Sequence, residues 1–281
     1  MLVDALVTYS SWDLEIPLIP ARSRLYCLDP ILMGTPYVES LTSYIARLAE
    51  AHCLSTRMLV AGCLVPLWNK TSRKHAKPFV DWSVDINGKK GSARKFVRTL
   101  EILTLQENLQ ILTMLCWEGT PGPAGLIGKR KWCPACYQEL RESQKPLYEP
   151  LLWSLNAVRC CPQHLTYLHT CCPHCGNTQR QISGNFRPGY CSKCQHWLGS
   201  SSSTELFKSI AITQTELEWE VWVAQTIGEA LAITPRRFRP VTKKTILDVY
   251  EYSNQHMWSG MDEFFHRHQY KVLMMVCWSG S

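Results

Sequence analysis

Four short motifs decide the fold of this chain: Cys133-Pro-Ala-Cys136, Cys161-Pro-Gln-His164, Cys172-Pro-His-Cys175 and Cys191-Ser-Lys-Cys194. A gap of two residues lets both donors of a motif turn toward one point. Two such motifs supply the tetrahedral thiolate and imidazole donors that Zn²⁺ prefers. The order predicts two zinc ions per chain. The first site is Cys133, Cys136, Cys161 and His164, and the second is Cys172, Cys175, Cys191 and Cys194.

The register of each site follows from the spacing of its donors. The second site has the C-x2-C-x15-C-x2-C pattern of a zinc ribbon, and the first has C-x2-C-x24-C-x2-H. Cys160 and Cys171 directly precede donors, but only Cys161 and Cys172 stand at the two-residue spacing from His164 and Cys175. Four protein donors close a zinc site, so the pattern predicts structural metal and not catalysis.

Composition sets the class of protein. The chain has 281 residues, of which 46% are hydrophobic and 19% charged, as is typical of globular proteins. The net charge of +7 favours an anionic partner. No Lys or Arg precedes Arg22, and no apolar run is long enough to cross a bilayer. We therefore expect a cytoplasmic protein without a membrane partner, whose paired cysteines bind metal and do not form disulfides.

Apolar periodicity predicts a mainly α fold. Residues 34–62 read as two helices joined by a tight turn, as in a helix-turn-helix. The first helix has Thr35 as its cap and Pro36 in its first turn, and the second is capped by Ser55 and stops at Gly62. Asn87-Gly88 and Lys89-Lys90-Gly91 predict a surface loop.

Two further helices are predicted at 93–102 and 105–115, separated by a capping box of Thr104 and Glu107. The segment 147–158 is expected to pack on the first metal site through Trp153. After a Gly-Ser linker, a capping box of Thr215 and Glu218 begins a helix with an apolar stripe, and helices follow at 244–254 and 261–276. The stripe consists of Leu217, Val221, Ala224 and Ile227.

The predicted organisation has four parts: an N-terminal docking segment (1–21), a helix-turn-helix-like helical domain (22–120), two tandem zinc-ribbon or knuckle modules (129–198) and a C-terminal helical region (204–281). The chain ends at Trp278-Ser-Gly-Ser directly after an apolar run. The sequence leaves open whether the last region continues beyond residue 281.

Two kinds of surface are candidates for binding partners. The first is the apolar docking segment, which packs either on its own domain or on a partner protein. Its candidate partner-binding residues are Tyr9, Trp12, Leu14 and Ile16. The second is a set of basic clusters, which are either solvated loops or contacts to nucleic-acid phosphates. They comprise Lys89, Lys90 and Arg94; Lys129, Arg130 and Lys131; and Arg236, Arg237, Arg239, Lys243 and Lys244.

We expect no enzymatic activity and assign no catalytic residue. The sequence contains no Walker phosphate loop, dinucleotide fingerprint or zinc-protease motif. A thioredoxin-like role for Cys133-Pro-Ala-Cys136 would need a βαβ unit around it. A zinc hydrolase or deaminase would need an open metal position and a glutamate base.

Several stretches together resemble one family. They are Leu25-Tyr-Cys-Leu-Asp-Pro, then Gly34-Thr-Pro-Tyr-Val-Glu-Ser-Leu-Thr-Ser-Tyr-Ile-Ala-Arg-Leu-Ala, then the ordered cysteine motifs. In combination they resemble the TniQ/TnsD family of Tn7-like transposons over roughly residues 22–200. The family's zinc ligands map onto the eight positions named above.

The resemblance implies a non-catalytic, DNA-binding target-selection adaptor in bacterial transposition. Such proteins link a target-recognition element to an AAA+ ATPase regulator. The element is either attachment-site DNA or an RNA-guided CRISPR effector complex. The alternative is a stand-alone, sequence-specific regulator with zinc ribbons, which would bind duplex DNA tightly without partners.

Overall fold

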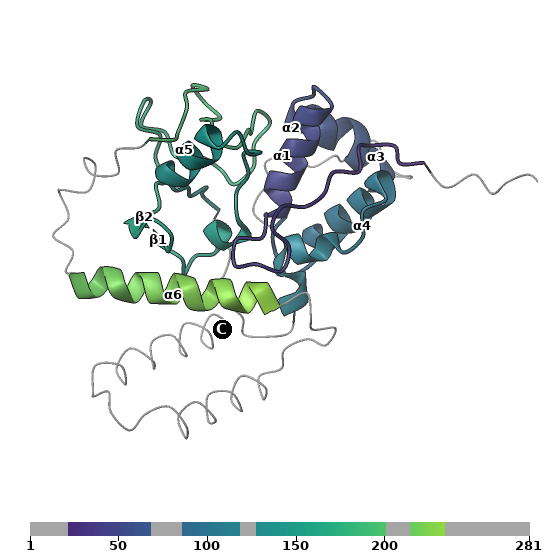
Figure 1. Ribbon diagram of the computed structural model, residues 1–281. Coiled ribbons are helices and arrows are strands. Elements are labelled where there is room, and N and C mark those ends of the chain that lie inside the picture. The colour runs from purple at the N-terminus through teal and green to yellow at the C-terminus, as the bar shows by residue number, and fades with distance from the viewer. Residues whose placement is uncertain (1–21, 69–85, 119–127, 201–213, 234–281) are drawn as a thin grey trace, which may run out of the picture.

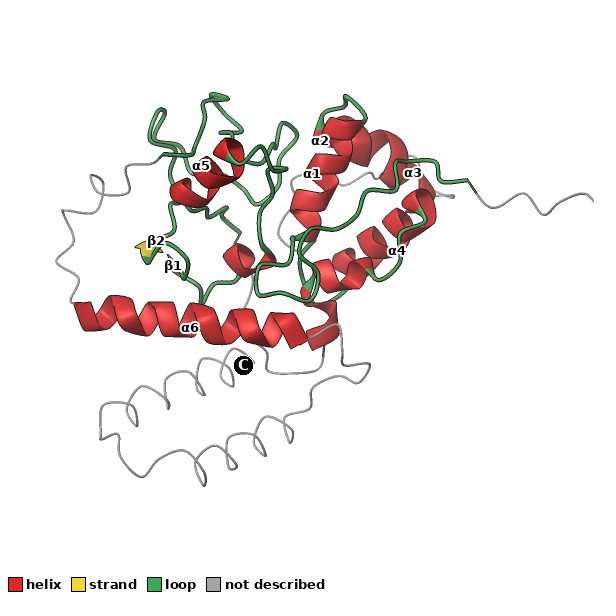
Figure 2. Ribbon diagram, in the orientation of Figure 1, coloured by secondary structure: helices red, strands yellow, loops and turns green. Residues whose placement is uncertain are grey.

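A computed structural model describes residues 22–68, 86–118, 128–200 and 214–233 of the chain (Figure 1). The described part is helix-rich and contains one short two-stranded sheet (Figure 2), which confirms the mainly α prediction. The helices are α1 (Leu41–Ala51), α2 (Thr56–Leu59), a π-helical turn (Val60–Leu64), α3 (Val65–Trp68), α4 (Ser92–Thr104), α5 (Pro134–Glu142) and α6 (Gln214–Ile233). The 3-10 turns are Leu109–Leu112, Met114–Trp117 and Leu151–Ser154, and the strands are β1 (Cys160–Cys161) and β2 (Thr166–Tyr167).

Helix α1 begins later than the sequence predicted. Ser40 is its N-cap, and the Ser40 hydroxyl accepts a hydrogen bond from the Ser43 amide at 3.3 Å. The proposed cap, Thr35, instead donates from its hydroxyl to the Leu32 carbonyl at 2.8 Å and closes a turn. Placing Thr35 and Pro36 at the start of this helix was therefore wrong, because the threonine hydroxyl is used in the preceding turn.

The second helix begins as predicted and ends later. The Ser55 hydroxyl accepts from the Met58 amide at 3.2 Å and caps α2. Gly62 does not end the helix, which continues through the π-helical turn into α3. The continuous helical stretch Thr56–Trp68 makes an angle of 97° with α1. The buried side chains of Leu59, Val60 and Leu64 explain the continuation, since their packing outweighs the weak stop signal of one glycine. An angle near 90–120° is typical of helix-turn-helix pairs.

The predicted helix over 105–115 was wrong. Helix α4 extends through Thr104, whose hydroxyl donates to the Leu100 carbonyl at 2.7 Å instead of capping a new helix. Leu105 then takes a left-handed conformation with φ of 56°, and Asn108 another with φ of 64°. Two left-handed residues this close break a helix, so the segment folds as two 3-10 turns.

The predicted surface loop is exposed at Lys90 and Gly91, but Asn87 lies in the interior, so the prediction was wrong for Asn87. Its side chain is fully buried, and its amide oxygen accepts from the Thr42 amide at 3.0 Å. Its amide nitrogen donates to the Ser154 hydroxyl at 2.9 Å and to the Gln181 oxygen at 3.3 Å. One side chain thus joins α1 to two separate stretches of the chain, one around Ser154 and the other around Gln181.

We call residues 22–68 and 86–118 the helical segment and residues 128–200 the metal-binding segment. The two segments pack together through backbone pairing and a shared core. The Leu151 amide donates to the Val38 carbonyl at 2.8 Å, next to a bridge between Glu39 and Pro150. As expected, Trp153 is buried here. Its ring packs edge-on against the ring of Tyr137 in α5, with 5.7 Å between the ring centroids. The buried apolar residues form one cluster that runs through both segments.

Helix α6 lies below both the helical segment and the metal-binding segment in the view of Figure 1. It begins at Gln214, one residue before the predicted cap Thr215. Its buried stripe includes Ala224 and Ile227, as predicted, and extends to Leu231. A methyl group added at Gly228 would come within 2.8 Å of a Pro36 side-chain carbon, so the glycine permits close packing. The two helices predicted after residue 234 lie outside the described residues.

Candidate metal centres

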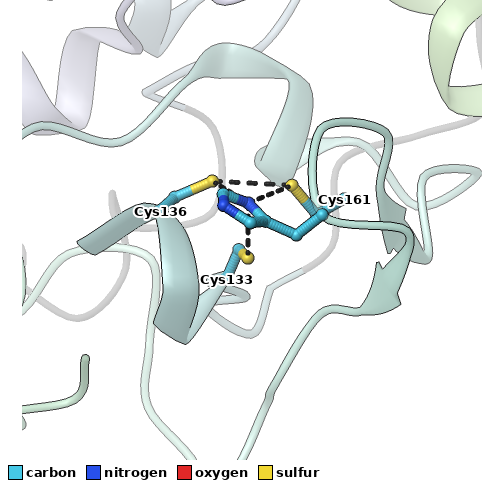
Figure 3. A group of neighbouring side chains, drawn as sticks. Cys133, Cys136 and Cys161 are labelled. Atoms are coloured by element: carbon cyan, nitrogen blue, oxygen red, sulfur yellow. Dashed lines mark hydrogen bonds between the residues drawn. The ribbon is translucent and has the colours of Figure 1, made fainter. Parts of the chain in front are cut away.

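The first group of predicted donors converges at the start of α5 and the β1–β2 hairpin. Cys133 and Cys136 flank the first turn of α5, and Cys161 ends β1. The imidazole Nδ1 of His164 lies 3.2 Å from the Cys136 sulfur and 3.6 Å from each of the sulfurs of Cys133 and Cys161. Figure 3 shows the side chains of Cys133, Cys136 and Cys161 turned toward a common point. All four donor atoms lie within 4.8 Å of one another.

The second group of predicted donors forms another closed cluster. The sulfur of Cys172 lies 3.7 Å from that of Cys194, and the sulfur of Cys175 lies 3.7 Å from that of Cys191. The four sulfurs lie within 4.8 Å of one another. The structure therefore brings all eight predicted donors together, in the two groups that their spacing predicted. Cys160 and Cys171 belong to neither group.

The spacing of the donors fits a tetrahedral ion. Sulfurs at about 2.3 Å from a central metal stand about 3.8 Å apart, and a sulfur and an imidazole nitrogen stand about 3.6 Å apart. The observed separations between pairs of sulfurs are 3.5 and 3.7 Å, and those between sulfur and nitrogen are 3.2 and 3.6 Å. Both clusters could hold metal ions.

The donor thiols differ in how readily they ionise. Hydrogen bonds with Cys133 and Cys161, followed by burial, raise the pKa of Cys136. Burial raises the pKa of Cys172 to about 12. Burial also opposes ionisation of Cys191, but the backbone amides of Cys194 and Lys193 outweigh it and lower the pKa of Cys191 to about 6. A bound metal ion would favour the thiolate form of every donor cysteine, because the thiolate and not the thiol is the metal ligand.

Groups around each cluster orient the donors. The Nε2 of His164 lies 2.8 Å from a carboxylate oxygen of Glu139, so Nδ1 is left to face the sulfurs. A carboxylate on the outer nitrogen is the usual partner of a metal-binding histidine. The sequence reading missed Glu139, although a helix starting at Pro134 places it one turn beyond the donors. In the second cluster, the Gln179 amide donates to the Cys191 sulfur.

The structure contradicts two of the predicted nucleic-acid contacts. Arg130 is 1% exposed, and its guanidinium binds Glu149 at 2.6 Å and Tyr137 at 2.9 Å. Burial disfavours the charged guanidinium, but the charge of Glu149 outweighs it and raises the pKa of Arg130. Lys131 is buried as well, and its ammonium donates to the carbonyls of Leu155 and Val158. Neither side chain reaches the surface, so assigning them to phosphates was wrong.

The other predicted contacts divide into surface residues and residues outside the described ranges. Lys129, Lys90 and Arg94 are exposed, and Lys89 is half-buried. Arg94 pairs with Glu118. The basic residues of the last cluster and the candidate docking residues lie outside the described ranges: Arg236, Arg237, Arg239, Lys243 and Lys244, and Tyr9, Trp12, Leu14 and Ile16.

The Glu39-Ser-Leu-Thr-Ser-Tyr stretch has a structural role. The fully buried carboxylate of Glu39 accepts two hydrogen bonds from the Arg47 guanidinium, each at 2.8 Å, and one from the Ser43 hydroxyl at 2.9 Å. The Ser43 hydroxyl in turn accepts from the Glu149 amide at 3.0 Å, and the Tyr44 hydroxyl donates to the Leu28 carbonyl at 3.0 Å. The stretch therefore fixes the start of α1 against the metal-binding half.

The fold and the site define a helical segment joined to two closed clusters of Cys and His donors that could hold metal ions. Comparison with protein families gives its identity. Residues 30–168 match the model of the TniQ family, so the chain belongs to this family. The match runs from before α1 to the end of β2 and includes all four donors of the first cluster. A comparison with curated proteins found no match.

Membership supports a general role in target selection during Tn7-like transposition, together with DNA binding. The family consists of non-catalytic adaptors. Within the described residues, no single helix is long and apolar enough to cross a membrane. Taken together, α1 and the helical stretch Thr56–Trp68 have the length and apolar composition of a membrane span, but they are bent by 97° relative to each other.

Proposed function

We propose that this protein is a non-catalytic target-selection adaptor of a Tn7-like transposon, acting in the bacterial cytoplasm. It links a target-recognition element to an AAA+ ATPase that regulates transposition. The TniQ match over the helical segment and the first metal cluster carries the proposal. The closed donor sets support a structural role for the metal, because four protein donors leave no position for a substrate.

The metal we assign to both clusters is Zn²⁺, two ions per chain. Thiolate and imidazole donors in a tetrahedral arrangement suit zinc better than oxygen-seeking cations such as Mg²⁺. Each ion would hold its loops rigid, and no step of a reaction would run through it. Elemental analysis of the purified protein should give two zinc ions per chain. One ion or none would overturn the assignment.

The test of the adaptor role is retention of the ATPase. The full chain, immobilised on resin, should retain the AAA+ ATPase of the same transposon in the presence of ATP. Retention that equals the level on bare resin would overturn the link to the ATPase. Tight binding of duplex DNA by the chain alone, with no retention of ATPase, would favour the stand-alone regulator instead.

The docking residues we assign to the ATPase contact are Tyr9, Trp12, Leu14 and Ile16. Trp12 is the anchor, because buried aromatic residues dominate many protein interfaces. Replacing it (Trp12→Ala) should lower retention of the ATPase at least tenfold, while the zinc content stays at two. Tyr26→Ala is a matched control, since Tyr26 is an exposed aromatic outside this segment. Equal retention by Trp12→Ala and the wild type would remove Trp12 from the interface.

The target-recognition element is either attachment-site DNA or an RNA-guided CRISPR effector complex. Co-purification with the effector proteins and their guide RNA would assign the chain to the RNA-guided branch. Protection of one genomic DNA sequence by the chain without a guide would assign it to the direct-binding branch. Either result keeps the adaptor role.

A further inference from the structure

A basic hollow lies where the start of α2 meets the segment that holds the second metal cluster. Its volume is about 670 Å³. The lining residues come from α2, from Gly128 and Lys129, and from two stretches around the second cluster, 178–185 and 192–193. These parts are far apart in the sequence, so only the folded chain forms this surface.

The hollow gathers positive charge without an acidic neighbour. Four cationic residues line it, namely Arg57, Lys129, Arg180 and Lys193, and all are exposed. None of its described lining residues is Asp or Glu, and none of these four cations is in an ion pair with a described carboxylate. Like charges held together disfavour one another, so the arrangement is suited to an anionic ligand.

Two serine hydroxyls in the same wall have unused hydrogen-bonding capacity. The side-chain oxygens of Ser183 and Ser192 are buried, and neither has a hydrogen-bond partner among the described residues. Most buried hydroxyls in proteins are paired, so an unpaired one needs a specific explanation. A rotation of either side chain about χ1 would turn its buried hydroxyl toward the hollow, where it can donate to an anionic oxygen beside the cations.

The wall of the hollow is held in place before any ligand binds. Gln179 donates to the Cys191 sulfur and accepts from the Ser192 amide at 2.7 Å, which ties the wall to the second metal cluster. The Arg57 amide donates to the Gly184 carbonyl at 3.1 Å, and Lys129 pairs through its backbone with Arg180. Binding would therefore require little ordering of the backbone.

We propose that this hollow holds a backbone phosphate of duplex DNA. The proposal rests on the adaptor function above and names the surface through which the adaptor contacts its target. Cations and hydroxyls are the usual partners of phosphate oxygens. No aromatic side chain is found among the described lining residues, so a base has nothing to stack on. A contact of this kind positions the protein on DNA without reading sequence.

The first test measures binding to a fluorescein-labelled duplex of mixed sequence by anisotropy, between about 50 and 200 mM salt. The double variant Arg180→Ala/Lys193→Ala should bind at least about tenfold more weakly than the wild type, since it loses two cations that neutralise the phosphate charge. The slope of log K against log salt should become shallower by about 0.9 per lost contact. Arg98→Ala is the control, because Arg98 is exposed on α4 outside the hollow and should keep the wild-type slope.

The second test uses the serines and separates binding from stability. Ser183→Ala and Ser192→Ala remove hydroxyls that have no described partner in the free protein, so neither should lower the melting temperature. Each should weaken DNA binding several-fold, because the phosphate loses a donor. A lower melting temperature with wild-type DNA affinity would show a structural role and would overturn this part of the proposal.

The outcomes also separate this site from the adaptor role. Wild-type affinity and salt slope in the double variant, with two zinc ions bound, would overturn the phosphate site. A loss seen with an RNA duplex but not with DNA would overturn the choice of DNA. ATPase retention, measured on the same variants, should stay at the wild-type level. If it does so while DNA binding is also unchanged, only the phosphate site fails and the adaptor function stands.

Discussion

Arg130 and Glu149 form a buried ion pair, with the guanidinium Nε 2.6 Å from the carboxylate. Arg130 also donates to the carbonyl of Tyr190 at 2.7 Å, in the stretch that leads into the second metal cluster. The Glu149 amide donates to the Ser43 hydroxyl of α1. The pair thus joins two parts of the metal-binding segment, and the backbone of Glu149 links it to α1, so loss of the pair should destabilise the whole fold.

Replacing Arg130 by methionine should lower the free energy of unfolding by about 3–5 kcal/mol, because Glu149 is left buried without its counter-charge. Denaturant unfolding followed by tryptophan fluorescence measures this. Lys129→Met is the control: Lys129 is next to Arg130 but exposed, so replacing it should change the free energy of unfolding by no more than about 0.5 kcal/mol. Equal stability of the two variants would contradict the importance assigned to the pair.

The run Lys129-Arg130-Lys131 shows where sequence reading reaches its limit. In composition it is an ordinary basic cluster, and only Lys129 proves to be exposed. Arg130 is buried because its guanidinium binds Glu149, nineteen residues further along, and a backbone carbonyl sixty residues away. Contacts at such separations leave no periodic signal. Arg57, Arg180 and Lys193 were missed for the same reason, since they meet only in the folded chain.

Donor spacing succeeded because it records local geometry. Two donors separated by two residues must share a turn, so the motifs predicted their own grouping. Capping signals were less reliable. Ser55 caps α2 as predicted, but Thr104 closes α4 from within, because the left-handed Leu105 ends that helix. An isolated capping pattern does not reveal the conformation of the next residue.

Asn87→Ala should be strongly destabilising, although Asn-Gly is usually a surface turn. The change leaves the buried Thr42 amide without its acceptor and removes the donor to Ser154 and Gln181. Each buried group left unpaired costs about 1–3 kcal/mol, so we expect a loss of about 3 kcal/mol in the free energy of unfolding. Asn156→Ala is the matched control on an exposed asparagine. A similar small effect at both positions would contradict a structural role for Asn87.

Neighbouring cysteines allow a direct test of the donor register. Cys172→Ser should lower the zinc content from two ions per chain to one, because Cys172 belongs to the second cluster. Cys171→Ser should leave it at two, since Cys171 is exposed and outside both clusters. Elemental analysis of both purified variants gives the ratio. Loss of an ion in Cys171→Ser, with full loading of Cys172→Ser, would shift the register by one residue.

The contact between Glu139 and His164 predicts a difference in metal affinity between the clusters. Glu139→Gln should weaken zinc binding at the first cluster by about 10–100-fold, because the carboxylate orients the imidazole toward the metal. Competition with a chromophoric chelator measures the two ions separately, and only one of them should become easier to remove. Glu142→Gln, one turn further along α5 and exposed, should leave both ions as tightly held as in the wild type. If Glu139→Gln releases both ions alike, then the carboxylate acts on the fold as a whole and not on the orientation of His164.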